Sequence, residues 1–266
     1  MLRIIVPIKQ VPESSNVKMD PETGTIVRTG VESVVNPLDL YALETALRIR
    51  EEQGGEITAL SMGPDQALRV LKEAIAMGCD RGVLISDRLF GGSDTWATSY
   101  TIAQGIRKIG DVDLIVTGER ATDGDTAQVG PGIAAWLGIP ALTYVSTIKE
   151  IRDKEIILER LTEEGYQQVS APLPCLISVL KEIGRPRLPT LRGKIQATQT
   201  EIAVFSSENM ELDTARLGLN GSPTRVTKIE NSKVVRDGRI LSASDETSLN
   251  EAIEELLRFL DEKGLI

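Results

Sequence analysis

The sequence predicts an α/β fold built on a doubly wound, mostly parallel sheet, and three observations support this prediction. Short β-branched apolar segments alternate with amphipathic segments of helical period through the first half of the chain. The connections between them are short and contain Gly or Pro. Of the 266 residues, 41% are hydrophobic and 26% are charged, which is typical of a folded globular protein. Alternation of this kind implies right-handed crossovers and helices on both faces of a Rossmann-like sheet.

The first elements are a strand, a hairpin and a helix. Residues 3–8 are apolar and β-branched, which is typical of a buried strand. A loop with both Pro and Gly predicts a hairpin over residues 17–28. We expect Asn36 to cap the next helix, with Pro37 at its first position, because leucines then recur at spacings of three and four until Gly54.

Strands and helices continue to alternate after this helix. Residues 57–61 predict a strand, and a helix over residues 68–77 ends at a glycine. A third central strand follows at residues 83–86. Asp94 can cap a helix that runs to about residue 108.

The next strand, residues 113–117, ends at Gly118 and precedes a loop rich in Gly and Asp. We expect the helix after this loop to run from about Thr126 to Leu137, with Asp125 or Thr126 as its cap. Further strand-like segments complete the sheet with some antiparallel pairing: residues 141–145, 155–160, 166–170 and 174–180.

The alternation is lost beyond about residue 204. A capping box, Ser248-Leu-Asn-Glu251, then opens a helix with apolar residues at helical spacing. Because so long a stretch without periodicity is unusual inside a compact domain, we divide the chain into an α/β domain and an arm. The domain covers residues 1–205, and the arm covers residues 206–266 and packs on a partner. A terminal helix that folds back onto its own sheet is an equally open alternative.

Composition excludes several kinds of chemistry. The chain has no His, so it cannot by itself build a His-based nucleophile, a His general base or a His-dependent metal site. Its two cysteines are too few for a structural zinc or an iron–sulfur cluster. The formal net charge of −9 and the 3% of aromatic residues argue against nucleic-acid binding. Redox chemistry here would need a bound cofactor.

We expect a cytoplasmic protein without membrane insertion. The start of the chain has no cleavage-site pattern, and no stretch approaches the ~18 apolar residues that cross a bilayer. Cys79 and Cys175 are far apart in the sequence, which fits a reducing compartment, and we expect both to be packing residues.

The sequence places a ligand site at the carboxyl ends of the central strands. In an open parallel sheet, ligands bind there, at the point where the strand order reverses. Pro7, Met62, Gly63 and Gly118 lie at such ends. The segment from Gly118 to Pro131 leads into a helix N-terminus, so its backbone N–H groups can receive phosphate. We favour a binding loop over an incidental surface turn, although the usual Gly-rich dinucleotide and P-loop motifs are absent.

Two aspartates of this loop, Asp123 and Asp125, could together ligate Mg²⁺. We favour another role, in which one caps the helix and the other bonds a turn or a ribose hydroxyl, because no third acidic ligand is nearby. Paired carboxylates acting as a hydrolase acid and base are a minor alternative. We therefore predict no metal site and assign no catalytic side chain.

Six short motifs in register point to a family. They are Lys9-Gln-Val-Pro12, Val35-Asn-Pro-Leu-Asp39, Ser61-Met-Gly-Pro64, Ala76-Met-Gly-Cys-Asp-Arg-Gly82, Thr122-Asp-Gly-Asp-Thr-Ala-Gln-Val-Gly-Pro131 and Arg185-Pro-Arg-Leu-Pro-Thr-Leu191. In this order and spacing, the chain closely resembles the β subunit of electron transfer flavoproteins. The resemblance runs from residue 1 to about 200 and is looser through the arm.

The resemblance implies a partner and a cofactor. β subunits of this family pair with an α subunit that holds the electron-transferring FAD, and they bind either AMP or a second FAD themselves. The strand-end positions and the family's nucleotide contacts together give the cofactor-binding residues that we predict. These are Pro7, Asn36, Pro37, Leu38, Asp39, Met62, Gly63, Asp94, Thr95, Thr98, Gly118, Glu119, Arg120, Ala121, Thr122, Asp123, Gly124, Asp125, Thr126, Ala127, Gln128 and Val129.

The segments Asp94–Thr98 and Asp123–Pro131 are most similar to flavin-bifurcating members of the family. In these, the second FAD accepts a hydride from NADH and sends one electron to the α-subunit flavin and one to ferredoxin; some members work in reverse. The α-subunit flavin serves a flavin-containing dehydrogenase, of the acyl-CoA or 2-hydroxy acid type. The alternative is an AMP-binding subunit that supports and docks a single-FAD protein without chemistry of its own.

Two loop residues depart from the pattern of the similar bifurcating proteins. Arg120 replaces a Gln and Thr122 replaces an Ile. Arg120 could pair with a diphosphate or tune a flavin, and a solvated arginine at the edge of the loop is the alternative.

The family's partner-docking loop falls on Ile183, Arg185, Pro186 and Arg187, where Ile183 matches the exposed apolar anchor. Arg185 stands where acidic or neutral residues are common, so the resemblance does not imply the usual acyl-CoA dehydrogenase partner. Without the family, the basic residues of this segment would most often form a solvated face. Outside the family, a nucleotide-binding regulatory domain similar to stress-response proteins is a third alternative.

Overall fold

The described part of the chain forms two compact units. The computed structural model describes residues 1–13, 33–152, 154–227, 238 and 240–266. The units are Met1–Thr227 and Lys228–Ile266, and each is described by itself. Among these described residues, no helix is both long and apolar enough to cross a membrane.

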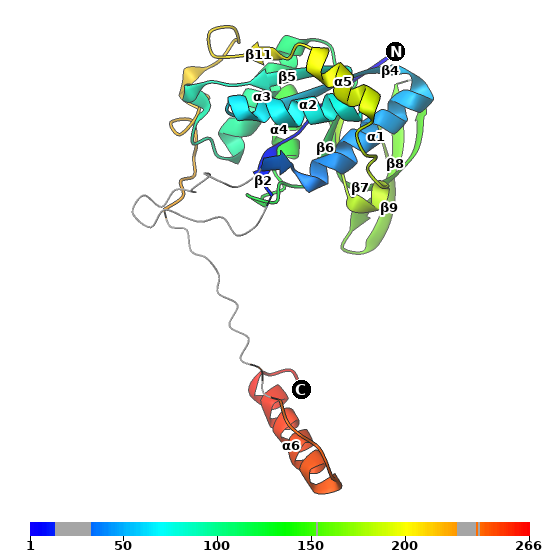
Figure 1. Cartoon of the computed structure of the whole chain (residues 1–266), viewed down its shortest axis with the longest axis vertical. Helices are drawn as coiled ribbons and strands as arrows, with labels where there is room; N and C mark the ends of the chain where they lie inside the picture. Colours follow the sequence, from blue (N-terminus) through cyan, green and yellow to red (C-terminus); the bar gives the residue numbers. More distant parts are fainter. Residues whose placement is uncertain (14–32, 153, 228–237, 239) are drawn as a thin grey trace. The chain divides into compact units, whose positions relative to one another are not determined.

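The first unit contains a nine-stranded sheet that is parallel over most of its width (Figure 1). In the order β11-β5-β4-β1-β6-β10-β7-β8-β9, the strands from β11 to β7 pair in parallel and β8 and β9 pair antiparallel. The bounds are β1 (Leu2–Pro7), β4 (Gly55–Met62), β5 (Arg81–Ile85), β6 (Leu114–Gly118), β7 (Ala141–Arg152), β8 (Glu155–Thr162), β9 (Gly165–Pro172), β10 (Cys175–Val179) and β11 (Ala203–Phe205). The predicted mostly parallel sheet is confirmed.

A separate antiparallel pair joins β2 (Gln10–Pro12) to β3 (Ser33–Val35). The hairpin predicted over residues 17–28 lies outside the described residues.

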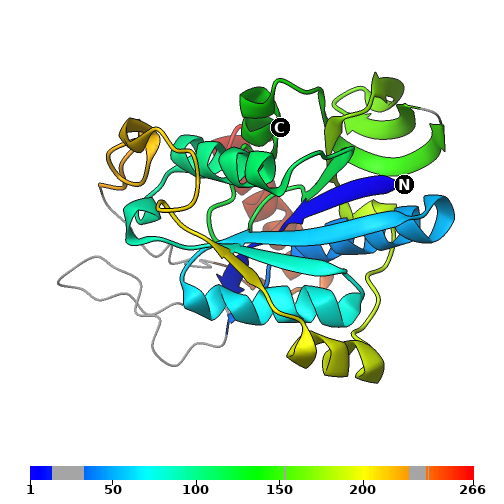
Figure 2. The same ribbon diagram turned by 90° about the horizontal axis from the view of Figure 1, so that it is seen from above.

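Helices cover both faces of the sheet (Figure 2). Helices α1 (Pro37–Gln53) and α2 (Leu68–Met77) lie on one face, and α3 (Thr95–Ile109) and α4 (Val129–Leu137) lie on the other. Helix α5 (Leu191–Gln199), which was not predicted, packs on α2. The 3₁₀ turns are η1 (Asp65–Ala67), η2 (Arg88–Phe90), η3 (Lys181–Ile183) and η4 (Thr214–Arg216).

Successive residues of the central strands face the two helix layers in turn. In β1, Ile4 and Val6 pack on the side of α1 and α2, whereas Ile5 packs on the side of α3 and α4. In β4, Ile57 and Leu60 divide in the same way. Because both faces are buried, these strands are continuous apolar segments in the sequence, which is why they could be predicted.

Helix α4 begins later than predicted, at Val129 instead of near Thr126. Asp125 and Ala127 have φ values of 53° and 56°, which a right-handed helix does not contain. Gln128 occupies the cap position and makes no side-chain cap bond. Neither Asp125 nor Thr126 therefore caps this helix.

The boundary between the two units lies at Thr227 and not at residue 205. Residues 206–227 pack on the first unit, because Met210 and Leu217 are buried with the residues under α3 and α4. Two widely spaced apolar residues give no periodic signal, so the sequence did not predict this packing.

The second unit contains one amphipathic helix, α6 (Glu246–Glu262). Its cap is Asp245, whose side chain accepts a hydrogen bond from the N–H of Ser248, so the helix begins before the predicted Ser248. No residue of α6 is buried within the described structure. Its exposed apolar residues are Leu249, Ile253, Leu256, Leu257 and Phe259.

Candidate functional site

Strand β1 lies where the strand order reverses. The chain runs from β1 to β4 and β5 on one side and then returns to β6 on the other side of β1. Because these strands are parallel, their carboxyl ends share one edge of the sheet. Pro7, Met62 and Gly118 are their last residues, so the strand-end positions named from the sequence do come together at the switch point. The loop that follows β6, residues 118–128, is called the switch-point loop below.

Asn36 connects the start of α1 to the switch-point loop. Its side chain does not cap α1, contrary to the prediction. Instead, Nδ2 donates to the carbonyl oxygen of Arg120 (2.9 Å), and the N–H of Thr122 donates to Oδ1 (3.2 Å). The residue is 0% exposed. Its backbone N–H donates to the carbonyl oxygen of Lys9 (2.8 Å), so one residue joins the segment after β1 to the loop after β6.

Asp39, in the first turn of α1, is buried beside two strand ends. The backbone N–H of Lys9 donates to its Oδ2 (2.7 Å), and the backbone N–H of Gly118 donates to the same carboxylate. Burial raises the pKa of Asp39 to about 7, and these hydrogen bonds, a further one from the Asn36 side chain and the charge of Lys9 offset only part of that effect. A Cβ atom at Gly118 would lie 2.6 Å from Asp39 Oδ1, so only glycine fits at the end of β6.

Two ion pairs involve the aspartates of the switch-point loop. Lys9 Nζ lies 2.7 Å from Asp123 Oδ1, and Arg120 Nε lies 3.0 Å from Asp125 Oδ1. All four side chains are partly exposed, so each pair stabilises the loop by no more than ~1 kcal/mol. Within the described ranges, no group of three or more Cys, Asp or Glu residues could hold a metal ion.

Lys9 was missing from the predicted site residues, although a motif quoted from the sequence contains it. Its partner Asp123 is 114 positions away, and only the pairing of β1 with β6 brings the two together. No sequence spacing could have shown this contact.

The switch-point loop offers space and strained backbone for a nucleotide. A Cβ atom at Gly124 would meet no atom within 4 Å, and residues 122–126 are all exposed. Asp125 and Ala127 are held at positive φ, which costs about 1 kcal/mol or more per residue and is concentrated at binding sites. The exposed ion pairs are weak enough for a phosphate to compete for their two cations. These features fit the phosphate groups of AMP or FAD.

Asp94, Thr95 and Thr98 lie at the start of α3, which follows β5 and not one of the three strands at the switch point. Asp94 caps α3 as predicted. Its other oxygen accepts from the N–H and the hydroxyl of Thr224. Burial opposes ionisation, but these hydrogen bonds lower the pKa of Asp94 below its usual value. The carboxylate thus holds residue 224 against α3, which is a structural task within the chain.

The predicted partner-docking segment differs from expectation at two residues. Ile183 is half-buried and packs against the core on the α1 side, so it is not an exposed anchor. Arg187 is ion-paired with Glu44 (2.8 Å) and with Glu51, both on α1. These pairs hold the segment after η3 against α1.

The exposed apolar residues of this region are Leu188 and Leu191, at 85% and 77% exposure. They lie just before α5 and at its first position. Arg185 and Arg192 are also exposed beside them in the sequence. The signal for these leucines was present in the motif Arg185–Leu191, but choosing between them and Ile183 requires knowing which side chains the core covers.

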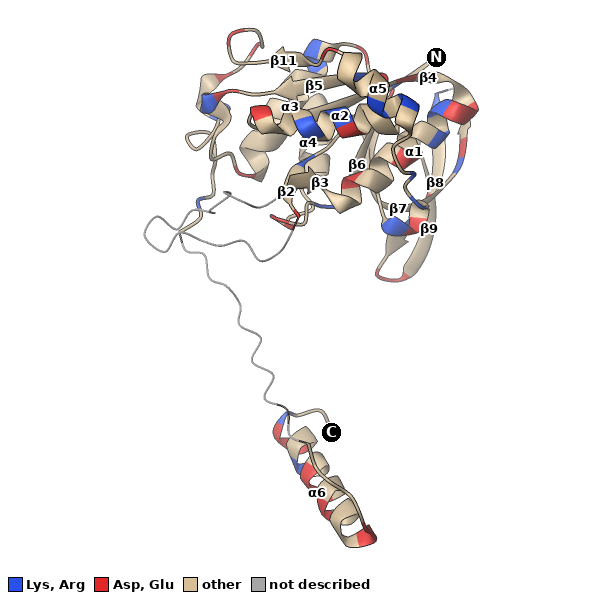
Figure 3. Ribbon diagram, in the orientation of Figure 1, with Lys and Arg blue, Asp and Glu red and all other residues tan. Residues whose placement is uncertain are grey.

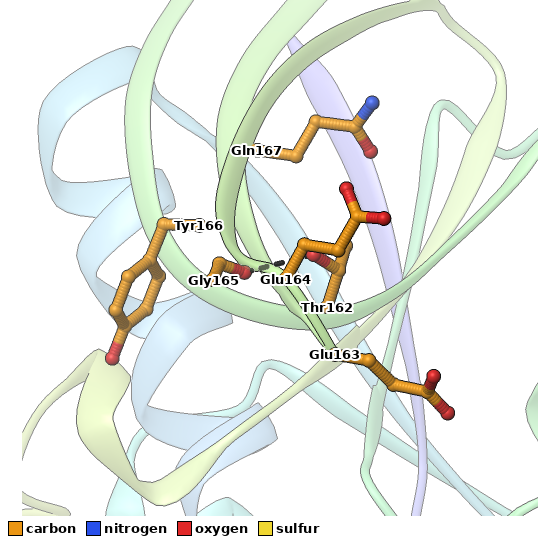
Figure 4. Close-up of a pocket in the computed structure, with 6 residues that line it drawn as sticks. All are labelled: Thr162, Glu163, Glu164, Gly165, Tyr166 and Gln167. Atoms are coloured by element: carbon orange, nitrogen blue, oxygen red, sulfur yellow. Dashed lines mark hydrogen bonds between the residues drawn. The ribbon is translucent and has the colours of Figure 1, made fainter.

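One surface hollow lies on a different part of the first unit (Figure 4). It is lined by Thr162, Glu163, Glu164, Gly165, Tyr166 and Gln167. All of these belong to the turn between β8 and β9 and its flanking positions, where the Thr162 hydroxyl donates to the carbonyl oxygen of Gly165 (2.9 Å). The hollow contains none of the predicted site residues, and we assign no function to it.

Known proteins similar to this chain share one family. The chain matches the electron transfer flavoprotein domain over residues 23–209. It is 44% identical, over the whole of both chains, to the caffeyl-CoA reductase–Etf complex subunit CarD of Acetobacterium woodii. It is 43% identical to the electron transfer flavoprotein subunit beta of Megasphaera elsdenii, over 96% of this chain and 98% of that one. It is also 43% identical to protein FixA of Azorhizobium caulinodans, over 86% of this chain and 84% of that one.

Proposed function

The chain belongs to the β-subunit family of electron transfer flavoproteins, and we propose that it is a flavin-bifurcating member that acts in the cytoplasm. Family membership replaces the alternative of a nucleotide-binding regulatory domain. The observation that carries the bifurcating proposal is the open space that Gly124 leaves between two aspartates of the switch-point loop.

The proposed cofactor of this subunit is a second FAD, held at the switch point. Bound FAD supplies the redox chemistry, a hydride exchanged with NAD(H) and single electrons exchanged with ferredoxin and the α-subunit FAD. The chain's own part is to bind and orient. Lys9 and Arg120, now paired with aspartates, would hold the phosphates together with the backbone N–H groups near the start of α4.

The proposed partners are an α subunit and a flavin-containing dehydrogenase, of the acyl-CoA or 2-hydroxy acid type. Leu188 and Leu191 give the dehydrogenase an apolar contact, and Lys and Arg residues lie on α5 (Figure 3). The exposed apolar face of α6 is suited to packing on the α subunit.

An AMP-binding, single-FAD member is the second candidate, and one observation favours it. Both cations of the switch-point loop are already paired with carboxylates. A nucleotide with one phosphate displaces fewer of these pairs than one with two.

Cofactor content of the purified αβ complex tests the proposal. The bifurcating type should contain about two FAD per heterodimer, and NADH should reduce two flavins in distinguishable steps. One FAD together with tightly bound AMP would instead establish the second candidate.

A Gly124→Ala variant sharpens this test. The added methyl group enters open space in the chain, so the variant should fold with unchanged stability. It should nevertheless lose the second FAD, because the methyl group takes up room that the cofactor needs. Full retention of two FAD by this variant would contradict the placement of the cofactor against the loop.

A further inference from the structure

The beginning of α1 holds the switch-point loop at three backbone positions, Gly118, Arg120 and Thr122. Asn36 bonds the backbone at two points two residues apart, Arg120 and Thr122. A residue of a parallel β-strand bonds the adjacent strand in the same way, with one bond to a carbonyl oxygen and one from an N–H two residues further on. The Asn36 side-chain amide therefore pairs with the loop as the backbone of a strand residue would. Asp39 holds the start of the same loop at Gly118.

Both side chains are too deeply placed to reach a ligand. Asn36 is 0% exposed and Asp39 is buried, whereas the loop residues that they hold lead to the exposed stretch 122–126. The Asp39 carboxylate and both functional groups of the Asn36 amide have partners inside the chain. Removing either side chain would leave part-buried backbone groups of the chain without these partners, which costs stability.

We propose that Asn36 and Asp39 are positioning residues, which hold the switch-point loop in the shape that receives a nucleotide without touching that nucleotide through their side chains. This inference rests on the proposed function of the loop. It replaces the expectation that these two residues are direct cofactor contacts. Its mechanism is pre-organisation, because a loop that has the binding-competent shape only part of the time binds with its intrinsic affinity multiplied by the fraction of time spent in that shape.

The test uses the full chain in complex with its α subunit, with Asn36→Ala as the main variant. Asn36→Ser is the second variant, because serine is a good helix cap that helps α1 to form yet is too short to bond both backbone groups. Asn209→Ala is the matched control. The Asn209 side chain also bonds the backbone at two points two residues apart, Val204 in β11 and Ser206 just after it, away from the switch-point loop.

Two quantities are measured for each variant after the nucleotides have been removed. One is hydrogen exchange of the amides of residues 118–125. The other is the Kd for added FAD and, separately, for added AMP at the β-subunit site. We expect both Asn36 variants to exchange at least tenfold faster in this segment and to bind whichever nucleotide the wild type takes up at least tenfold more weakly. Asn209→Ala should change neither quantity at the switch-point loop.

Two outcomes would overturn the inference. Weaker binding with unchanged exchange would mean that Asn36 contacts the nucleotide directly. Faster exchange with unchanged binding would mean that the loop need not be held in advance. A wild-type complex that takes up neither FAD nor AMP at this site would refute the proposed function instead, and the exchange of residues 118–125 would still show whether Asn36 holds the loop.

Discussion

Replacing Asp39 by Asn should change how the stability of this chain depends on pH. Burial raises the pKa of Asp39 from 3.8 to about 7 in the folded chain. A raised pKa means that the folded state binds the proton more tightly than the unfolded state does. The resulting stabilisation is fully present below pH 3.8 and is lost as the pH rises through about 7.

The size of the effect follows from these two pKa values. Between pH 5 and pH 8, proton linkage at a single group with pKa values of 3.8 and about 7 lowers the free energy of unfolding by about 2.5 kcal/mol. The amide that replaces the carboxyl group in Asp39→Asn is uncharged at every pH in this range. The free energy of unfolding of the wild type minus that of the variant should therefore fall by about the same amount from pH 5 to pH 8. This holds whatever the value of that difference at pH 5.

Urea unfolding of the isolated chain at pH 5, 6, 7 and 8 measures this change. Carboxylates whose pKa is lowered in the folded chain, such as Glu44, change the stability only at a pH below this window. They are present in both proteins, so their effect on the free energy of unfolding cancels in the comparison. Asp111→Asn, at an exposed surface position, is the control and should show a constant difference. A change below about 0.5 kcal/mol for Asp39→Asn, or one of opposite sign, would show that the N–H groups of Lys9 and Gly118 keep Asp39 ionised against its burial.

Three further variants separate stability from binding. Ala127→Gly should raise the free energy of unfolding by about 1 kcal/mol in urea, because glycine adopts the positive φ without strain; a loss of stability would contradict the strain assigned to this position. Glu44→Gln should lower it by ~1–2 kcal/mol near pH 7, since the ion pair with Arg187 is lost, and the difference should shrink as the pH falls below 4.5, where Glu44 becomes protonated first in the unfolded state and, at lower pH, in the folded state. Leu191→Ala should leave stability unchanged and weaken dehydrogenase binding in a calorimetric titration, whereas Ile183→Ala should cost about 1 kcal/mol of stability; the reverse pattern would restore Ile183 as the docking anchor.

Most of the sheet could be predicted because its strands are buried on both faces. Segments such as residues 83–86 and 113–117 are short, apolar and bounded by turn residues, so no other element competes for them. Helix α5 was missed for the opposite reason. Its exposed face includes Leu191 and Ile195, so polar and apolar residues are not divided in the usual way between solvent and core.

The location of the site could be predicted, but the roles of its residues could not. Strand ends and a Gly-rich loop identify the switch point without any knowledge of contacts. The tasks of Asn36 and Asp39 depend on which backbone atoms lie within about 3 Å of them, and these belong to residues 79 to 86 positions away or to a neighbouring strand end. Asn36 illustrates the limit, because the Asn-Pro pair has the local signature of a cap while its side chain bonds a distant loop.

The division of work among these side chains limits what can touch a cofactor. The Asn36 and Asp39 side chains form hydrogen bonds with other groups of the chain. Lys9 and Arg120 form ion pairs with aspartates of the loop. The groups that remain at the edge are backbone N–H groups and the exposed polar side chains of residues 122–128. Such groups bind and orient but do not transfer protons near neutral pH, which agrees with a chain that has no His and leaves the redox step to its cofactor. Substitutions along the exposed loop should therefore change the affinity for the proposed cofactor, whereas the redox reaction of that cofactor should persist in every variant that still holds it.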